Sequence, residues 1–226
     1  MIRLSSTPPK RLILCLFVLI NGSAMAGELY DRFPQRLTPG THYIVYLHGK
    51  IIEDAGTRPT HPVFGVYEFN EILSDFLNQG YSVIAEVRQS GTDVQEYATY
   101  VGNQLRRYRK QSDSDIAVVG FSKGAVIALT VSAQMNDPGI DYAILAGCWK
   151  SVTERDLPLS GRILSLYDVS DSVGSCQSLI ERSGDVSEFD EEVFDTGKSH
   201  GLFYRPDPVW IEPLFRWLKG NVSETL

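Results

Sequence analysis

The sequence has few cysteines and histidines. Its 226 residues include three cysteines and four histidines. None of them forms a CxxC, HxxxH or HExxH pattern, the spacings at which two such side chains can reach one ion. We therefore predict no metal site and no cofactor.

Long apolar runs and basic stretches are also scarce. The apolar run Leu12–Ile20 has nine residues, whereas a membrane-spanning helix needs roughly 20. Lys and Arg number 21 against 28 Asp and Glu, which gives a net charge of -7. No basic stripe stands out that could pair with phosphates. These absences predict neither a stable membrane anchor nor a nucleic-acid partner, and nothing in the sequence indicates an oligomeric state.

The N-terminus has the three parts of an export signal. Three cations precede the apolar run, and Ala24 and Ala26 supply small residues at the two positions that a signal peptidase reads. We predict that residues 1–26 are a signal peptide cleaved after Ala26, and that residues 27–226 act in the periplasm or outside the cell. The alternative, a membrane tether, is disfavoured by the short run.

Short apolar runs alternate with helical patterns over the rest of the chain. We expect strands at Tyr43–Leu47, Tyr81–Val87, Ile116–Val119, Tyr142–Leu145 and Ile163–Tyr167, with a weaker last edge strand at Glu188–Phe194. We expect helices at Val66–Asn78, Val94–Lys110, Lys123–Met135, Val173–Ser183 and Pro208–Leu218. The alternation predicts one α/β domain with a mostly parallel central sheet and helices on both faces. Sites in such sheets form at the carboxyl ends of the strands.

Two cysteines remain after the leader is removed. Cys148 and Cys176 follow neighbouring predicted strands, and an even number of cysteines suits an oxidising compartment. Adjacent strands lie about 4.8 Å apart, within the Cα–Cα range of a disulfide. We predict a Cys148–Cys176 disulfide, the alternative being two separate buried thiols.

The pattern Gly120-x-Ser122-x-Gly124 joins a predicted strand to a predicted helix. A serine hydroxyl is a weak nucleophile and must project into open space to meet a base. A sharp strand-to-helix turn presents it in this way, and side chains at the two glycine positions would collide with the turn. The alternative is an ordinary turn with an exposed serine.

With this turn the chain resembles the α/β hydrolases, over nearly all of residues 27–226. His48-Gly49 is similar to the oxyanion loop of that family, and the chain order of serine, aspartate and histidine is the family's order. The resemblance implies that Ser122 is the nucleophile and His200 its base. It also implies that the backbone N–H groups of Lys123 and Lys50 bind the oxyanion, although Lys50 stands where the family has further glycines.

Two carboxylates follow the strand Ile163–Tyr167 and could orient His200. Matching the strand to its counterpart in the family places Asp168 at the start of the turn and Asp171 on the acid position. We predict that Asp171 serves His200, while Asp168 caps the turn through the backbone. Asp168 as the acid remains the alternative.

The resemblance predicts a serine hydrolase with a Ser-His-Asp triad, acting on a small or soluble ester, because the chain leaves no room for a large cap domain. The irregular stretch 50–65 could roof the site with Phe64. Phe121, Trp149 and Phe203 would be either apolar walls or core. The alternatives are a thioesterase, a peptidase, or a non-catalytic binding or scaffold protein on the same fold.

For four other side chains near these strand ends we expect ordinary structural roles. We expect Arg88 and Glu86 to form a surface ion pair, with recognition of a charged substrate group as the alternative. The side chain of Lys123 is expected in solvent, and His48 is expected to orient its turn.

Overall fold

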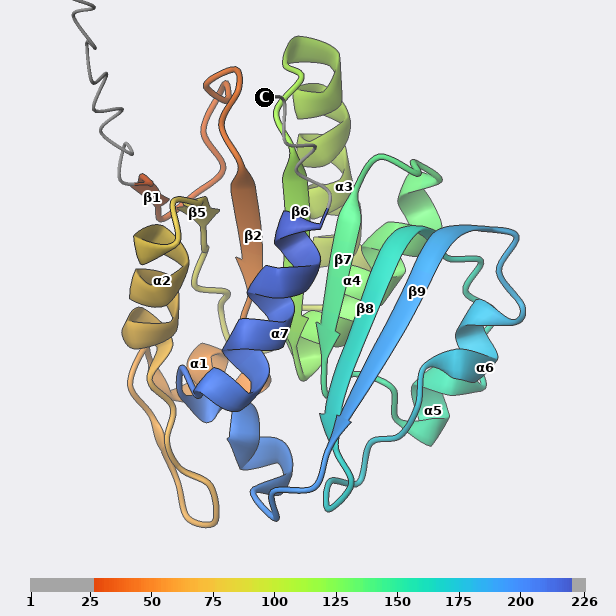
Figure 1. Ribbon diagram of the computed structural model, residues 1–226. Coiled ribbons are helices and arrows are strands. Elements are labelled where there is room, and N and C mark those ends of the chain that lie inside the picture. The colour runs from red at the N-terminus through yellow and green to blue at the C-terminus, as the bar shows by residue number, and fades with distance from the viewer. Residues whose placement is uncertain (1–26, 221–226) are drawn as a thin grey trace, which may run out of the picture.

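Seven strands form one parallel sheet at the centre of the molecule (Figure 1), and the computed structural model describes residues 27–220. The strand order is β1-β5-β2-β6-β7-β8-β9, and every neighbouring pair is parallel. The strands are β1 (Leu29–Tyr30), β2 (Tyr43–Leu47), β5 (Ser82–Ile84), β6 (Ile116–Phe121), β7 (Asp141–Leu145), β8 (Ser160–Asp168) and β9 (Asp185–Phe194). The predicted signal peptide lies outside the described residues.

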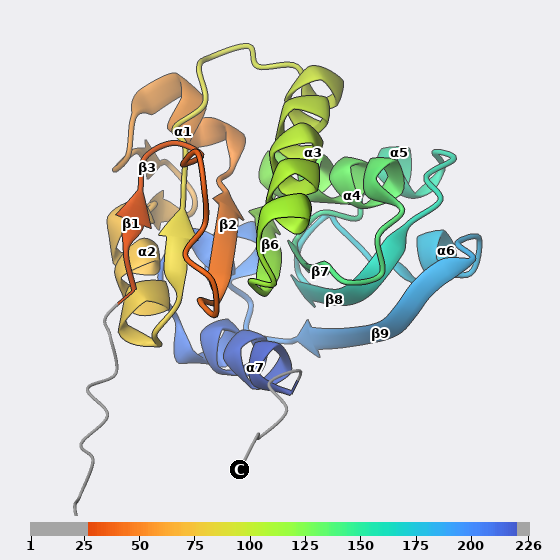
Figure 2. The same cartoon turned by 90° about the horizontal axis from the view of Figure 1, so that it is seen from above.

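Helices cover both faces of the sheet, as predicted (Figure 2). The helices are α1 (Lys50–Ala55), α2 (Phe69–Asn78), α3 (Val94–Gln111), α4 (Lys123–Met135), α5 (Lys150–Thr153), α6 (Gln177–Ile180) and α7 (Pro208–Lys219), with the 3-10 helix η1 (Ser199–Tyr204). Strand side chains alternate between the faces: Ile44 and Tyr46 pack with α2 and α7, whereas Val45 and Leu47 pack with α3 and α4. The predicted fold class is confirmed.

Several predicted segments differ from the structure in their bounds. The helix expected from Val66 begins at Phe69, because Gly65–Val66 (β4) pairs with Thr60–His61 (β3) in a small antiparallel hairpin. The stretch 50–65 was expected to be irregular. In the structure it contains the helix α1 and part of this hairpin. The helix expected at 173–183 shortens to α6, since the residues before it form a loop that is tied to the end of β7.

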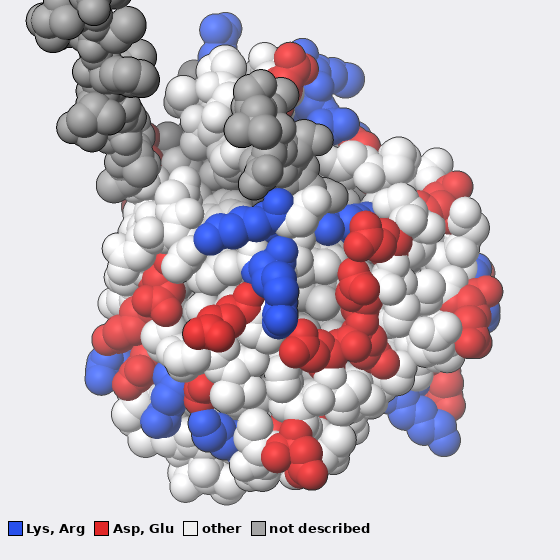
Figure 3. Space-filling view, viewed as in Figure 1, with Lys and Arg blue, Asp and Glu red and all other residues white. Residues whose placement is uncertain are grey.

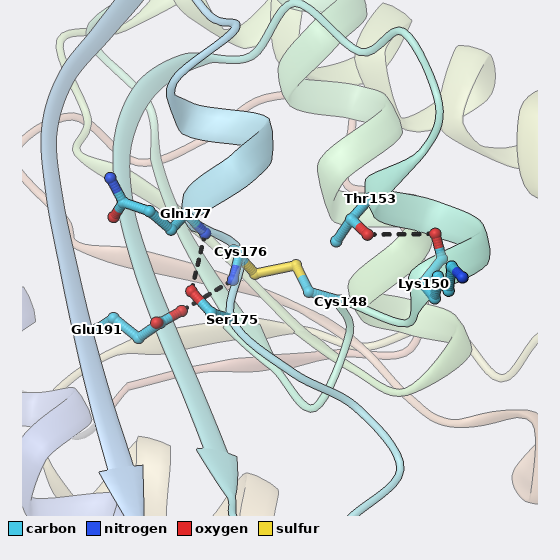
Figure 4. The surroundings of a disulfide bond; sticks show 7 residues. All are labelled: Cys148, Lys150, Thr153, Ser175, Cys176, Gln177 and Glu191. Atoms are coloured by element: carbon cyan, nitrogen blue, oxygen red, sulfur yellow. Dashed lines mark hydrogen bonds between the residues drawn. A yellow bond between two sulfur atoms is a disulfide. The ribbon is translucent and has the colours of Figure 1, made fainter.

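The predicted Cys148–Cys176 disulfide connects this loop to the residues that follow β7 (Figure 4). Cys148 and Cys176 are bonded with their Cα atoms 5.3 Å apart. The backbone N–H of Gly174 also donates to the carbonyl of Cys148, at 3.1 Å. The loop between β8 and α6, which contains Asp171, is thereby held against the loop that follows β7.

Strand β9 forms one edge of the sheet and is strongly acidic. It is ten residues long, and acidic side chains gather over it on the face seen in Figure 3. The acidic residues of the strand are Asp185, Glu188, Asp190, Glu191 and Glu192. Charged side chains on an edge strand oppose its pairing with another chain.

Candidate active site

Ser122 occupies a strained turn between β6 and α4. Its backbone has φ 55° and ψ -120°, a conformation that costs a non-glycine residue about 1–3 kcal/mol. The flanking glycines make the turn possible. A Cβ on Gly120 would lie 2.4 Å from the carbonyl oxygen of Gly124, and one on Gly124 would lie 1.8 Å from that of Leu47. Neither position admits a larger residue without moving the backbone.

Two hydrogen bonds connect Ser122, His200 and Asp171. The Ser122 hydroxyl lies 2.9 Å from Nε2 of His200, and Nδ1 of His200 lies 2.6 Å from Oδ2 of Asp171. An ionised carboxylate can only accept, so Nδ1 carries the proton and Nε2 is free to accept from the hydroxyl. The structure therefore brings together the three residues selected from the sequence, from the β6–α4 turn, the loop after β8 and η1.

Asp171 is enclosed at the end of this chain. Its side chain is 3% exposed and that of His200 15%. Burial raises the pKa of Asp171, but the hydrogen bond and charge of His200 outweigh that effect and hold the pKa below its ordinary value. The carboxylate is thus ionised at neutral pH and holds the imidazole in the tautomer that accepts from Ser122.

Asp168 has a different set of partners. Its carboxylate accepts from the backbone N–H of Ser170 and of Thr196, both at 2.9 Å, and from both hydroxyls, each at 2.5 Å. Burial opposes ionisation, yet these four bonds lower the pKa of Asp168 to about 2. The structure thus places Asp168 as a support for its own turn and for the loop that leads to His200.

Two helix N-termini meet beside Ser122. Lys50 is the first residue of α1 and Lys123 the first of α4, and no side chain caps either helix. N–H groups in the first turn of a helix have no partner within it and carry partial positive charge. A Cβ on Gly49 would lie 3.5 Å from that of Ser122. Gly49 and Ser122, the residues that precede the two predicted oxyanion donors, therefore lie side by side.

A buried ion cluster lies behind these two helix ends, and the sequence did not indicate it. Nε of Arg88 donates to Oε1 of Glu53 at 2.8 Å, and both side chains are fully buried. Nζ of Lys123 donates to Oε2 of Glu53 at 2.6 Å and to the carbonyl of Thr92 at 2.5 Å. The expected surface pair between Arg88 and Glu86 is wrong, because Glu86 instead accepts from two tyrosine hydroxyls, those of Tyr97 and Tyr100.

The Lys123 side chain was expected in solvent, and this expectation is also wrong. It is only 16% exposed, because α1 places Glu53 within its reach. It points to that carboxylate and not to the Ser122 hydroxyl.

His48 is fully buried in the turn that leads into α1. Its Nε2 accepts from the backbone N–H of Arg88 at 3.0 Å, and its Nδ1 lies 2.9 Å from the carbonyl oxygen of Gly49. Burial and then the positive charge of Arg88 lower the pKa of His48 to about 3. A neutral His48 therefore orients this turn.

Aromatic rings surround His200. The ring centroids of Phe121, Trp149 and Phe64 lie 4.9, 5.7 and 6.0 Å from that of His200. Phe64, at the β3–β4 hairpin, covers the imidazole as expected of a roof. Phe203 is core, because it is fully buried and packs against Trp210 at 5.7 Å.

No group of three or more His, Cys, Asp or Glu between residues 27 and 220 is arranged to hold a metal ion. Over the same range, no helix has the length and apolar character required to cross a membrane.

Solved structures share the architecture of this chain. Mouse α/β-hydrolase domain-containing protein 10 is 11% identical and superposes with a TM-score of 0.56, over 82% of this chain and 91% of the mouse chain. An esterase from Pyrococcus furiosus is 15% identical, with a TM-score of 0.56 over 80% of this chain and 82% of its own. A Butyrivibrio proteoclasticus protein solved with ferulic acid bound is 11% identical, with a TM-score of 0.56 over 84% and 92%.

At such identities the likeness concerns the fold. No protein-family model matches the sequence, and no curated protein matches it. The chain has the α/β-hydrolase fold.

Proposed function

We propose that the protein is a serine hydrolase that cleaves a small or soluble ester through an acyl-enzyme. The observation that carries this proposal is the pair of hydrogen bonds from Asp171 through His200 to Ser122, at a serine held in a strained turn. Strain of this kind persists where the surrounding structure enforces it and is concentrated at functional sites. A binding or scaffold protein on the same fold would not require this arrangement.

The chemistry follows from the geometry. Nε2 of His200 takes the hydroxyl proton as Ser122 Oγ attacks the ester carbonyl carbon. Asp171 stabilises the imidazolium, and the N–H groups of Lys50 and Lys123 stabilise the oxyanion. The imidazolium then gives its proton to the departing alkoxide. Water, deprotonated by the same nitrogen, hydrolyses the acyl-enzyme and releases the acid.

An ester is the favoured substrate among acyl compounds. Phe64 and Trp149 lie beside the imidazole and offer apolar surface to an acyl or alcohol group. Among proteins of similar fold are a named esterase and the protein with ferulic acid bound. A thioesterase or a peptidase would use the same triad, so turnover of matched ester, thioester and amide substrates separates these classes.

The direct test is labelling of residues 27–226 by a fluorophosphonate, which phosphonylates an activated serine. We expect one label on Ser122 and none on folded Ser122→Ala. Absence of label from the wild type, or a label that persists in the variant, contradicts the proposal.

We also propose that the protein is exported and cleaved after Ala26. The Cys148–Cys176 disulfide supports this proposal, because disulfides persist in oxidising compartments. Mass spectrometry of protein from its native host should find Gly27 at the N-terminus, and a mature chain that begins at Met1 would contradict it.

A further inference from the structure

Lys123 connects the two helix ends that border Ser122. Its backbone N–H is one proposed oxyanion donor, at the start of α4. Its side chain reaches Glu53 in α1 at 2.6 Å, and α1 begins with Lys50, the other proposed donor. A single ion pair thus joins the helix that carries one donor to the helix that carries the other.

Arg88 fixes Glu53 from the opposite side. Its Nε donates to Oε1, so that each oxygen of Glu53 binds a different cation. Arg88 also donates through its backbone N–H to Nε2 of His48, at 3.0 Å, and through its guanidinium to the carbonyl of His48. His48 is followed by Gly49 and Lys50, so the same cluster holds the turn that leads to the Lys50 N–H.

Stability alone does not account for the cluster. Removing ionised side chains from water is costly, and apolar replacements of buried pairs are often equally or more stable. In some proteins buried ion pairs instead fix a single geometry. Here the fixed geometry is the separation of two helix N-termini across Ser122.

We infer that Glu53 is a positioning residue for the oxyanion site, which keeps the N–H groups of Lys50 and Lys123 directed at one point beside Ser122. This inference rests on the proposed hydrolase function. It assigns Glu53 no contact with the substrate. Its effect on the reaction passes through the two donors.

The test compares wild type with Glu53→Gln, which keeps the size of the side chain and removes its charge. We expect kcat on p-nitrophenyl acetate to fall about 100-fold, the loss typical of a misplaced donor, with KM nearly unchanged. Binding of phenylboronic acid, which forms a tetrahedral adduct with a nucleophilic serine, should weaken by a similar factor. A purely structural role would lower stability and leave this affinity unchanged.

The matched control is Asp141→Asn, at the amino end of β7. Asp141 pairs with the buried Arg162 at 3.0 Å, so this variant makes the same chemical change in an ion pair at the amino ends of the strands, away from Ser122. We expect it to lower the free energy of unfolding while kcat stays near the wild-type value.

A second variant, Lys123→Met, tests the same connection if Glu53→Gln does not fold. Lys123→Met keeps the backbone donor and the Glu53–Arg88 pair while it removes the connection between the helices. It should lower kcat by a similar factor. Because both substitutions break one connection, the double variant should lose less than the product of the two single effects.

The outcomes separate the two claims. If the wild type is labelled and active but folded Glu53→Gln and Lys123→Met retain kcat and boronate affinity, the positioning role is wrong and the proposed function stands. A rise in KM with unchanged kcat overturns the positioning role as well. An unlabelled, inactive wild type overturns the proposed function and this inference with it.

Discussion

Two polar clusters meet at the N-terminus of α4, and they differ in their exposure to solvent. The Ser122–His200–Asp171 chain ends in a hydroxyl that is partly exposed, so a substrate can reach it. The Glu53–Arg88–Lys123 cluster is closed, because its carboxylate is fully buried between two cations. Ser122 and Lys123 are neighbours in the chain, yet one belongs to each cluster. The comparison teaches that a reacting group must stay accessible to substrate, whereas both oxygens of the positioning carboxylate are occupied by cations.

The largest expected effect comes from the open cluster. Replacement of Ser122 by Ala, or of His200 by Ala, removes the nucleophile or its base and should lower kcat on an activated ester by about 10⁶-fold. The double variant should be hardly worse than either single one, because the residues act as a unit. Circular dichroism and thermal unfolding check that the variants fold. Appreciable turnover by either folded variant would place the chemistry elsewhere.

Asp171 and Asp168, at the end of β8, differ in the same way, because Asp171 belongs to the reacting chain and Asp168 supports a turn. Asp171→Asn removes the charge that holds the His200 tautomer and should lower kcat by up to about 10⁴-fold with the fold intact. Kinetics on the purified, folded variant measure this loss.

Asp168→Asn should keep most of the activity. It places an amide where four donors converge on a carboxylate, and should lower the free energy of unfolding by about 1–3 kcal/mol. Kinetics and urea unfolding of both variants test the assignment. The reverse pattern would show that Asp168 is the acid.

Removal of the disulfide should affect stability more than chemistry. The bond joins cysteines 28 residues apart, and the loss of such a cross-link costs roughly 3 kcal/mol. Urea unfolding of Cys148→Ser/Cys176→Ser against wild type measures it. Because the bond holds the loop that carries Asp171, we also expect a modest loss of kcat. A double variant with unchanged stability contradicts this prediction.

The smallest effect on the reaction concerns His48, on the closed side, where the expected change is in stability alone. Its pKa is about 3 in the folded protein, against 6.5 for a histidine exposed to water, so the unfolded chain binds the extra proton first. The free energy of unfolding should therefore fall as the pH is lowered below 6.5, with a slope of up to about 1.4 kcal/mol per pH unit. The lowered pKa values of Asp168 and Asp171 confine their contributions to pH values below about 3.8. Urea unfolding of wild type and His48→Gln between about pH 6 and about pH 4.5 separates the contribution of His48 from that of carboxyl groups such as Glu188, and the slope should be flatter in the variant.

The open cluster could be selected from the sequence, and the closed one could not. The turn at Ser122 is local, since strand, two glycines and helix lie within ten residues of sequence. Asp171 and His200 followed from the resemblance to the α/β hydrolases, whose chain order of serine, aspartate and histidine this sequence shares. Glu53, in contrast, lies in a six-residue helix with no readable pattern. Its partners are 35 and 70 residues away, so only the three-dimensional fold reveals that a lysine and an arginine converge on it.

Short strands and helices were likewise not recognisable from the sequence. The central strands were recognisable because they are buried on both faces and read as continuous apolar runs. The β3–β4 hairpin was missed, since each of its strands has two residues and depends on contacts beyond its own sequence. Short elements of this kind place Phe64 and Glu53, which border the site without carrying a motif.

The carboxylates of the edge strand β9 bear on whether two copies of the protein can pair edge to edge. A second copy that approached β9 edge to edge would bring rows of carboxylates within about 5 Å of one another, and at neutral pH their repulsion opposes a continuous sheet across two molecules. Burial and its hydrogen bond with Asp190 raise the pKa of Glu188, so this position loses its charge early as the pH falls. Acidification should therefore weaken the repulsion at this edge, beginning at Glu188.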